Sequence, residues 1–249
     1  GHLYPESVRQ NTYLLGTYDP HQLHNKAATQ AQKGVVGQFL LPSFDAHIGK
    51  VSRLLSGKKP HWDLNWSSTK DPYELRQFMN QALVTCGREE GKPGLPLDID
   101  IETDSKEPIS VTDIRCVGIH NRVTGQVLVL DTSGMGETAG LVQEFAWWAR
   151  RKELLWAAQN GSYDWRVIYR LWNIEVPETW VEDSMVAHTL LLSDAPHDLG
   201  HIAFQYTDAP PWKPAKNVNG FDSFESPEEL HLYNAKDCRA TGLALEAMK

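Results

Sequence analysis

Three acidic side chains alternate with aliphatic ones in the segment 97–102, which reads Leu-Asp-Ile-Asp-Ile-Glu. Alternate residues of a β-strand project from the same face, so Asp98, Asp100 and Glu102 are expected on one face and the aliphatic residues on the other. Because close like charges repel and Asp is a poor strand former, an ordinary solvated strand is the weaker interpretation. Hard oxygen ligands of this kind suit Mg²⁺ or Mn²⁺. The segment therefore indicates a site for divalent cations.

Two further segments carry acidic groups at informative positions. Asn-Gly-Ser-Tyr-Asp at 160–164 follows an apolar run and precedes a helical pattern, so Asp164 is expected at a strand-to-helix turn beside the carboxyl end of a sheet. Tyr-Asn-Ala-Lys-Asp at 233–237 puts Tyr233 and Asp237 four residues apart on one helix face. Singly, each has an ordinary alternative, because a first-turn Asp favours the helix dipole and a helix Tyr is usually half-buried core. Their occurrence together with the first segment indicates a catalytic site.

Taken together and in this order, the three segments resemble the three exonuclease motifs of the DEDD superfamily. Asp100-Ile101-Glu102-Thr103 matches the first motif, 160–164 the second and 233–237 the third, and the resemblance covers roughly residues 95–249. The histidine form of the third motif would need His at position 232, which is Leu. The tyrosine form fits instead, which indicates the DEDDy subgroup.

Three other stretches extend this resemblance toward the proofreading domains of phage and bacterial polymerases. Residues 183–191 and 197–200 look like the helices between the second and third motifs of those domains. Trp212-Lys213 is similar to a loop of the phage-type members.

The resemblance implies a site as well as an activity. Two divalent metal ions, Mg²⁺ or Mn²⁺, would be held by four carboxylates, and Tyr233 would orient a water: the ligands are Asp100, Glu102, Asp164 and Asp237. Asp98 could replace Asp100 or Glu102 as a ligand, but Glu102-Thr103 agrees with the motif, so Asp98 is assigned a place behind the ligands. The substrate contacts expected from the motifs and the loop are Asn160, Thr103, Trp212 and Lys213.

The elements that must position these residues can be predicted from hydrophobic periodicity. Three antiparallel strands are expected at 97–102, 114–120 and 126–131, the last two joined by a hairpin loop at 121–125. Later elements are a strand at 154–159 and helices at 141–151, 163–172, 184–192 and 197–206. Ser226-Pro227-Glu228-Glu229 supplies an N-cap, a first-turn Pro and a capping-box Glu for a final helix. This order predicts a mixed sheet covered by helices. The resemblance implies an α/β fold of the ribonuclease-H-like kind, in which a mixed sheet of three antiparallel strands followed by parallel strands is flanked by helices.

Composition narrows the class of protein. The chain has 249 residues, of which 41% are hydrophobic, and lacks an apolar run long enough to span a bilayer. Its three cysteines, at 86, 116 and 238, have neither metal-ligand spacing nor disulfide density. We therefore expect a cytoplasmic protein that has no membrane partner. The resemblance to phage and bacterial polymerase domains implies that the cell is bacterial or phage-infected.

A Gly/Pro-rich stretch at 87–96 predicts a domain boundary, with an amino-terminal extension at 1–92 and an exonuclease domain at 93–249. Residues 1–92 carry 11 basic and 8 acidic side chains, whereas the remainder carries 13 and 24. An acidic domain binds phosphates poorly unless cations reverse its local sign.

The amino-terminal extension has its own faint resemblance. Residues 14–20 and 42–45, with Lys50, look like part of a uracil-DNA glycosylase, but Asp19 stands where that motif has His, so no glycosylase activity is expected. Packing against the exonuclease domain is the simpler role. Alternatively, basic and aromatic side chains could track single-stranded nucleic acid. They are Lys58, Lys59, His61, Trp62, Trp66 and Lys70.

The expected function is metal-dependent 3′–5′ exonuclease activity on single-stranded DNA, serving proofreading in a phage-like polymerase or in a free-standing relative. A polymerase domain or another replication component is the expected protein partner. Two alternatives remain open: an exoribonuclease resembling ribonuclease D, and a catalytically silent module that docks nucleic acid or polymerase. The presence of all four carboxylates and the Tyr counts against silence.

Overall fold

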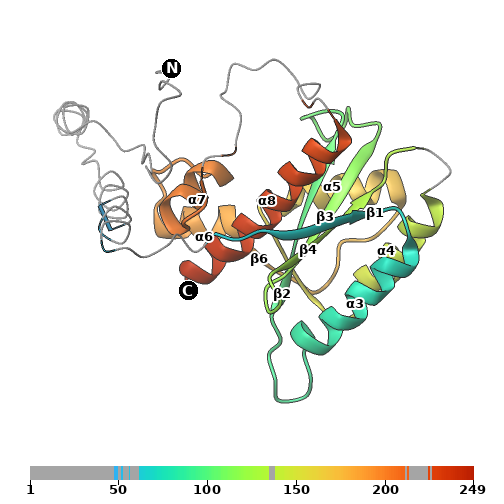
Figure 1. Ribbon diagram of the computed structural model, residues 1–249, viewed down its shortest axis with the longest axis horizontal. Coiled ribbons are helices and arrows are strands. Elements are labelled where there is room, and N and C mark those ends of the chain that lie inside the picture. Colours follow the sequence, from blue (N-terminus) through green and yellow to red (C-terminus); the bar gives the residue numbers. More distant parts are fainter. Residues whose placement is uncertain are drawn as a thin grey trace. The chain divides into compact units, whose positions relative to one another are not determined.

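The computed structural model describes residues 62–134, 138–210, 212, 224 and 226–249, with isolated positions at 48, 49, 52 and 56. The chain divides into two compact units, Gly1–His61 and Trp62–Lys249, and the motifs all lie in the second. Its elements, in order, are β1 (Asn65–Thr69), α3 (Pro72–Cys86), β2 (Pro96–Thr103), β3 (Ile114–Asn121), β4 (Gln126–Asp131), α4 (Ala139–Ala149), β5 (Leu155–Ala158), α5 (Gly161–Trp172), β6 (Trp180–Asp183), α6 (Ser184–Leu191), α7 (Leu199–Tyr206) and α8 (Pro227–Ala247) (Figure 1).

The strands form one mixed sheet in the order β1-β4-β3-β2-β5-β6. β2, β3 and β4 are antiparallel neighbours, whereas β5 and β6 continue the sheet in parallel from β2. The expected α/β fold, with three antiparallel strands followed by parallel ones, is therefore confirmed.

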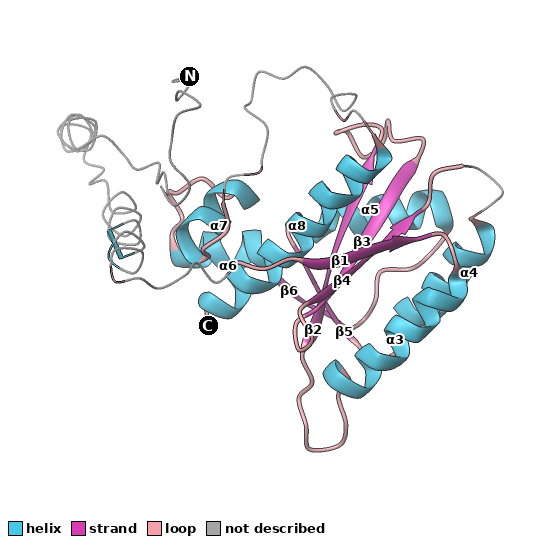
Figure 2. Cartoon of the chain, viewed as in Figure 1, coloured by secondary structure: helices cyan, strands magenta, loops and turns pink. Residues whose placement is uncertain are grey.

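Helices cover both faces of the sheet (Figure 2). Alternate residues of β2, such as Leu97 and Ile99, pack in an apolar core with side chains of α3, α4 and α5. On the opposite face, Val127 and Val129 of β4 pack against α8 through Leu230. Because successive strand residues face opposite ways, the acidic residues of β2 lie on the α8 face.

The compact unit that contains the motifs begins earlier than the sequence suggests. β1 pairs in parallel with β4, and α3 packs against α4, so residues from Trp62 onward belong to the unit that contains the motifs. The predicted boundary at 92/93 is corrected to 61/62. The Gly/Pro-rich stretch is a loop between α3 and β2 inside this unit, in which Glu89 and Lys92 form an isolated bridge.

The last helix begins as the sequence predicts. The Ser226 hydroxyl oxygen accepts a hydrogen bond from the Glu229 backbone N–H at 3.2 Å, and Pro227 occupies the first turn. None of the described helices combines the length and the apolar character of a membrane span. The glycosylase-like residues 14–20, 42–45 and Lys50 lie outside the described residues, as do Lys58, Lys59, His61 and Lys213.

Candidate active site

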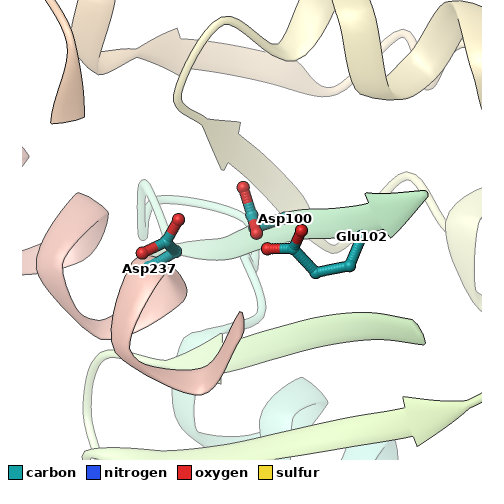
Figure 3. A group of neighbouring side chains, drawn as sticks. All are labelled: Asp100, Glu102 and Asp237. Atoms are coloured by element: carbon teal, nitrogen blue, oxygen red, sulfur yellow. The ribbon is translucent and has the colours of Figure 1, made fainter. Parts of the chain in front are cut away.

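Three of the four predicted carboxylates meet between β2 and α8. Asp100 and Glu102 extend from β2 and Asp237 extends from α8, with their side chains directed toward one another (Figure 3). One ligand oxygen of each lies within 4.8 Å of the others. Glu102 and Asp237 are buried, and the ladder between β2 and β3 is irregular directly after Glu102. Such irregularities re-aim side chains beside active sites.

Asn234 ties α8 to the metal-ligand candidates on β2. It is fully buried, and its side-chain amide donates to the backbone oxygen of Asp100 at 3.1 Å and to Asp100 Oδ2 at 2.8 Å. Gly118 of β3 permits this contact, because a Cβ atom there would overlap Asn234 Oδ1. Asn234 lies inside the third motif segment but was not predicted as a site residue, although a buried Asn one turn before Asp237 is an unusual helix residue.

Asp164 stands beside this group without joining it. β2 continues past β5, whose last paired residue, Ala158, is opposite Ile99. The chain then turns into α5, and Asp164 Oδ1 accepts the backbone N–H of Ile101 at 3.1 Å. Because Ile101 lies between Asp100 and Glu102, this bond fixes Asp164 at the same part of β2, although its oxygens are not part of the group of three.

The turn before Asp164 is held by Asp183, which was not predicted as a site residue. Asn160 has φ 58° and ψ 40°, a left-handed conformation that Asn tolerates better than most residues. Asp183 accepts the backbone N–H groups of Asn160 at 3.1 Å and Gly161 at 2.8 Å, and it also caps α6. Asn160 itself accepts from the Ser162 hydroxyl at 3.2 Å. Asn160 and Asp183 thus build the turn that carries Asp164.

Two aromatic residues complete the surroundings of Asp237. Tyr233 lies one turn earlier on α8, half-buried, with its ring 5.2 Å from that of Phe224. The indole N–H of Trp212 donates to Asp237 Oδ1 at 2.6 Å. Trp212 also stacks on Trp62, with ring centroids 5.8 Å apart. Trp212, expected as a substrate contact, therefore touches a metal-ligand candidate directly.

The other expected nucleic-acid contacts differ in position. Thr103 is buried, and its hydroxyl bonds the backbone oxygen of Ser105 and the Tyr163 hydroxyl, so a substrate contact through this group is unsupported. Lys70 pairs with Asp131 at 3.6 Å. Trp66 packs against the apolar cluster under α8. These contacts favour packing for Lys70 and Trp66.

Negative charge accumulates around the site. Burial raises the pKa of Asp164 to about 7, and the charges of Asp183 and Asp237 add to this rise, although the Ile101 N–H opposes it. Burial raises the pKa of the Cys238 thiol well above its usual value, and the Asp100 charge raises it further. A cation would relieve this repulsion.

Asp98 is fully buried behind the group of three, as expected for a supporting residue. Burial by itself would raise its pKa, but the Arg122 charge and hydrogen bonds from His120 and Arg122 lower it overall. Asp98 is therefore an ionised partner in an internal ion pair and is not one of the clustered oxygens.

Comparison with protein-family models gave no match, and neither did comparison with curated protein sequences. Solved structures do match. Escherichia coli RNase D, described as an exoribonuclease involved in structured RNA processing, has a TM-score of 0.53 at 12% identity, over 74% of this chain and 45% of that one. Trypanosoma brucei RNase D in complex with RNA U12 has a TM-score of 0.57 at 12% identity, over 75% and 63%.

A polymerase structure matches as well. The POL domain of Pol1 from M. smegmatis, in complex with DNA primer-template and dNTP, has a TM-score of 0.51 at 12% identity, over 73% of this chain and 27% of that one. This chain therefore spans less than two thirds of each of the three chains. These similarities confirm the expected fold, which this chain shares with the two RNases D and with the Pol1 domain.

Proposed function

We propose that the domain is a divalent-metal-dependent 3′–5′ exonuclease. The observation that carries the proposal is the convergence of Asp100, Glu102 and Asp237 within 4.8 Å, in a fold shared with RNase D. The donor set consists of carboxylate oxygens, which fit Mg²⁺ or Mn²⁺. When bound, such ions stabilise the attacking and leaving oxygens of phosphodiester hydrolysis.

The residues of this chain then have separate tasks. Asp100, Glu102 and Asp237 would hold one ion, and Asp100 with Asp164 would hold a second. Asn234 keeps Asp100 in place through its two hydrogen bonds. The Tyr233 hydroxyl would orient the attacking water by hydrogen bonding.

Single-stranded DNA is the proposed substrate and proofreading the proposed role, supported by the resemblance of residues 183–191 and 197–200 to proofreading domains and by the fold shared with the Pol1 domain. Single-stranded RNA is the second candidate, favoured by the similarity to two RNases D. A polymerase domain is the proposed protein partner, and the cytoplasm is the proposed compartment.

Degradation of matched DNA and RNA single strands, each labelled at the 5′ end, tests the proposal. A ladder that shortens from the 3′ end with Mn²⁺ and disappears with chelator is expected, with DNA cut faster than RNA. Asp237→Asn should abolish cleavage, whereas Glu175→Gln, which alters an exposed carboxylate on the loop after α5, should not. Faster RNA degradation would assign the exoribonuclease function. Binding without cleavage by the unaltered protein would contradict both and leave the docking module.

Proofreading can be tested separately with primer-templates. A mismatched primer 3′ end should be removed faster than a paired one, because unpaired ends reach a single-strand site at lower energetic cost. Equal rates on both ends would contradict the proofreading role and leave exonuclease activity itself intact.

A further inference from the structure

A chain of buried polar side chains lies behind the candidate active site. Asp98 accepts from Arg122 at 2.6 Å and lies 2.8 Å from His120 Nδ1, and the Asp98 and Arg122 side chains are 0% exposed. His120 Nε2 in turn lies 3.0 Å from Arg239 Nη1. Arg122 also pairs with Glu182 of β6 at 2.9 Å.

The geometry fixes the direction of these hydrogen bonds. A guanidinium group only donates, so His120 Nε2 must accept from Arg239. The remaining ring nitrogen, Nδ1, then carries the hydrogen and donates a hydrogen bond to Asp98 Oδ2. His120 is thus a directional link between an aspartate on β2 and an arginine on α8.

The two ends of this chain lie next to the metal-ligand candidates. Asp98 precedes Asp100 by two residues on β2, and Arg239 follows Asp237 by two residues on α8. Gly242, one turn further along α8, brings the helix against the chain, because a Cβ atom there would overlap Asp98 Oδ2 and His120 Nδ1. The helix is seated on the ion cluster rather than on apolar side chains at this point.

A buried ion cluster stabilises the folded state little more than apolar packing would. Its hydrogen bonds are directional, however, so they form only when the two elements lie in one relative position. The ligand oxygens of Asp100, Glu102 and Asp237 come from two elements, so their spacing depends on where α8 lies along β2. We propose that Asp98, His120 and Arg239 are positioning residues that set the register of α8 on β2 and thereby assemble the metal site. This inference rests on the proposed function, because it assigns the register a role in metal binding.

His120→Leu tests the inference, since it breaks the link between Asp98 and Arg239 without creating a buried charge. Asp98 keeps Arg122, and Arg239 keeps its contact with Asp63 at 3.5 Å. The affinity for Mn²⁺, measured by electron paramagnetic resonance of the free ion, should fall about 10- to 100-fold, as for other residues that orient metal ligands. The kcat should fall with it, whereas the KM for the oligonucleotide should not rise in proportion.

Val129→Ala is the matched control. Val129 is fully buried on β4 in the apolar cluster beneath α8, and its partner in the β3–β4 ladder is Gly118. This variant should lower the melting temperature and leave Mn²⁺ affinity unchanged. If His120→Leu lowers only the melting temperature, as Val129→Ala does, the positioning role is overturned.

If His120→Leu does not fold, His120→Gln and Arg239→Lys replace it, and wild-type Mn²⁺ affinity in both would overturn the inference. Failure of the proposed function can be distinguished from failure of this inference. If the wild-type protein binds Mn²⁺ but cleaves neither DNA nor RNA, the proposed function is wrong, and the comparison of Mn²⁺ affinities still tests the inference. If the wild-type protein binds no Mn²⁺, the inference is overturned, because there is then no metal site for the register of α8 to assemble.

Discussion

The indole N–H of Trp212 is hydrogen-bonded to Asp237 Oδ1 at 2.6 Å, across 25 residues of sequence. A donor in this position restrains the orientation of a carboxylate that also lies close to Asp100 and Glu102. It also adds a charge-assisted hydrogen bond to an acidic group that is nearly fully buried. Trp212 therefore contacts a metal-ligand candidate through its indole N–H and stacks on Trp62 through its ring.

Trp212→Phe is expected to lower exonuclease activity about tenfold or more, because it removes the donor to Asp237 and keeps an aromatic ring for stacking. Single-turnover cleavage of the preferred strand, with saturating Mn²⁺, measures the effect. Trp62→Phe is the matched control, since it alters the same stack without touching Asp237. Equal losses in both variants would mean that stacking, and not the hydrogen bond, is what matters.

Asp100→Asn should abolish both turnover and metal-dependent stabilisation. An ion that binds only the folded protein stabilises it by about 2.7 kcal/mol when present at 100 times its Kd. Melting curves with EDTA and with Mn²⁺ should therefore differ clearly for the wild type and coincide for Asp100→Asn. If Mn²⁺ raised the melting temperature of Asp100→Asn as much as that of the wild type, the assignment of Asp100 as a ligand would be contradicted.

The stability of the metal-free protein should depend on pH through Asp164. Its pKa is raised to about 7 in the fold, above the ordinary value near 3.8, so the folded state binds the proton more tightly than the unfolded state. The free energy of unfolding should therefore fall as pH rises from about 4 to about 7. Melting in EDTA at pH 5 and pH 7.5 should show this loss, and Asp164→Asn should reduce it. An identical pH dependence in the variant would contradict the raised pKa.

Tyr233→Phe should lower kcat by about 10²- to 10⁴-fold, the range of positioned proton-transfer groups, while the melting temperature stays near that of the wild type. The ring and its contact with Phe224 are retained, so only the hydroxyl is lost. Tyr169→Phe, at an exposed position on α5, should change neither quantity. A parallel loss of stability and activity would indicate that Tyr233 is mainly a packing residue.

The residues of the site were predictable where a local sequence pattern determines the structure around them. The alternation in 97–102 predicted the two faces of β2, and the Ser226 cap predicted the start of α8; both are confirmed. The group of Asp100, Glu102 and Asp237 followed from motif order, since strand and helix periodicity only decide which face a side chain takes. Their roles as ligands stay predictions until metal binding is measured.

Other features depend on contacts between distant segments. β1 reads Asn-Trp-Ser-Ser-Thr, and its only buried residue is Thr69, so no apolar alternation marks it as a strand. α3 buries residues at helical spacing, among them Leu75 and Met79, and this signal was present in the sequence but was assigned to an extension. Asp183 gained its role only because β6 lies beside β5, which places its carboxylate over the turn at Asn160.

The parallel pairing of β1 with β4 has a practical consequence for the design of recombinant fragments. A protein shortened to residues 93–249 would lose β1 and leave one side of β4 with unpaired N–H and C=O groups, which is a template for pairing between copies and for aggregation. It would also strip α3 from the core that Leu97 and Ile99 share with it. A fragment intended for crystallisation or assay should therefore begin before Trp62.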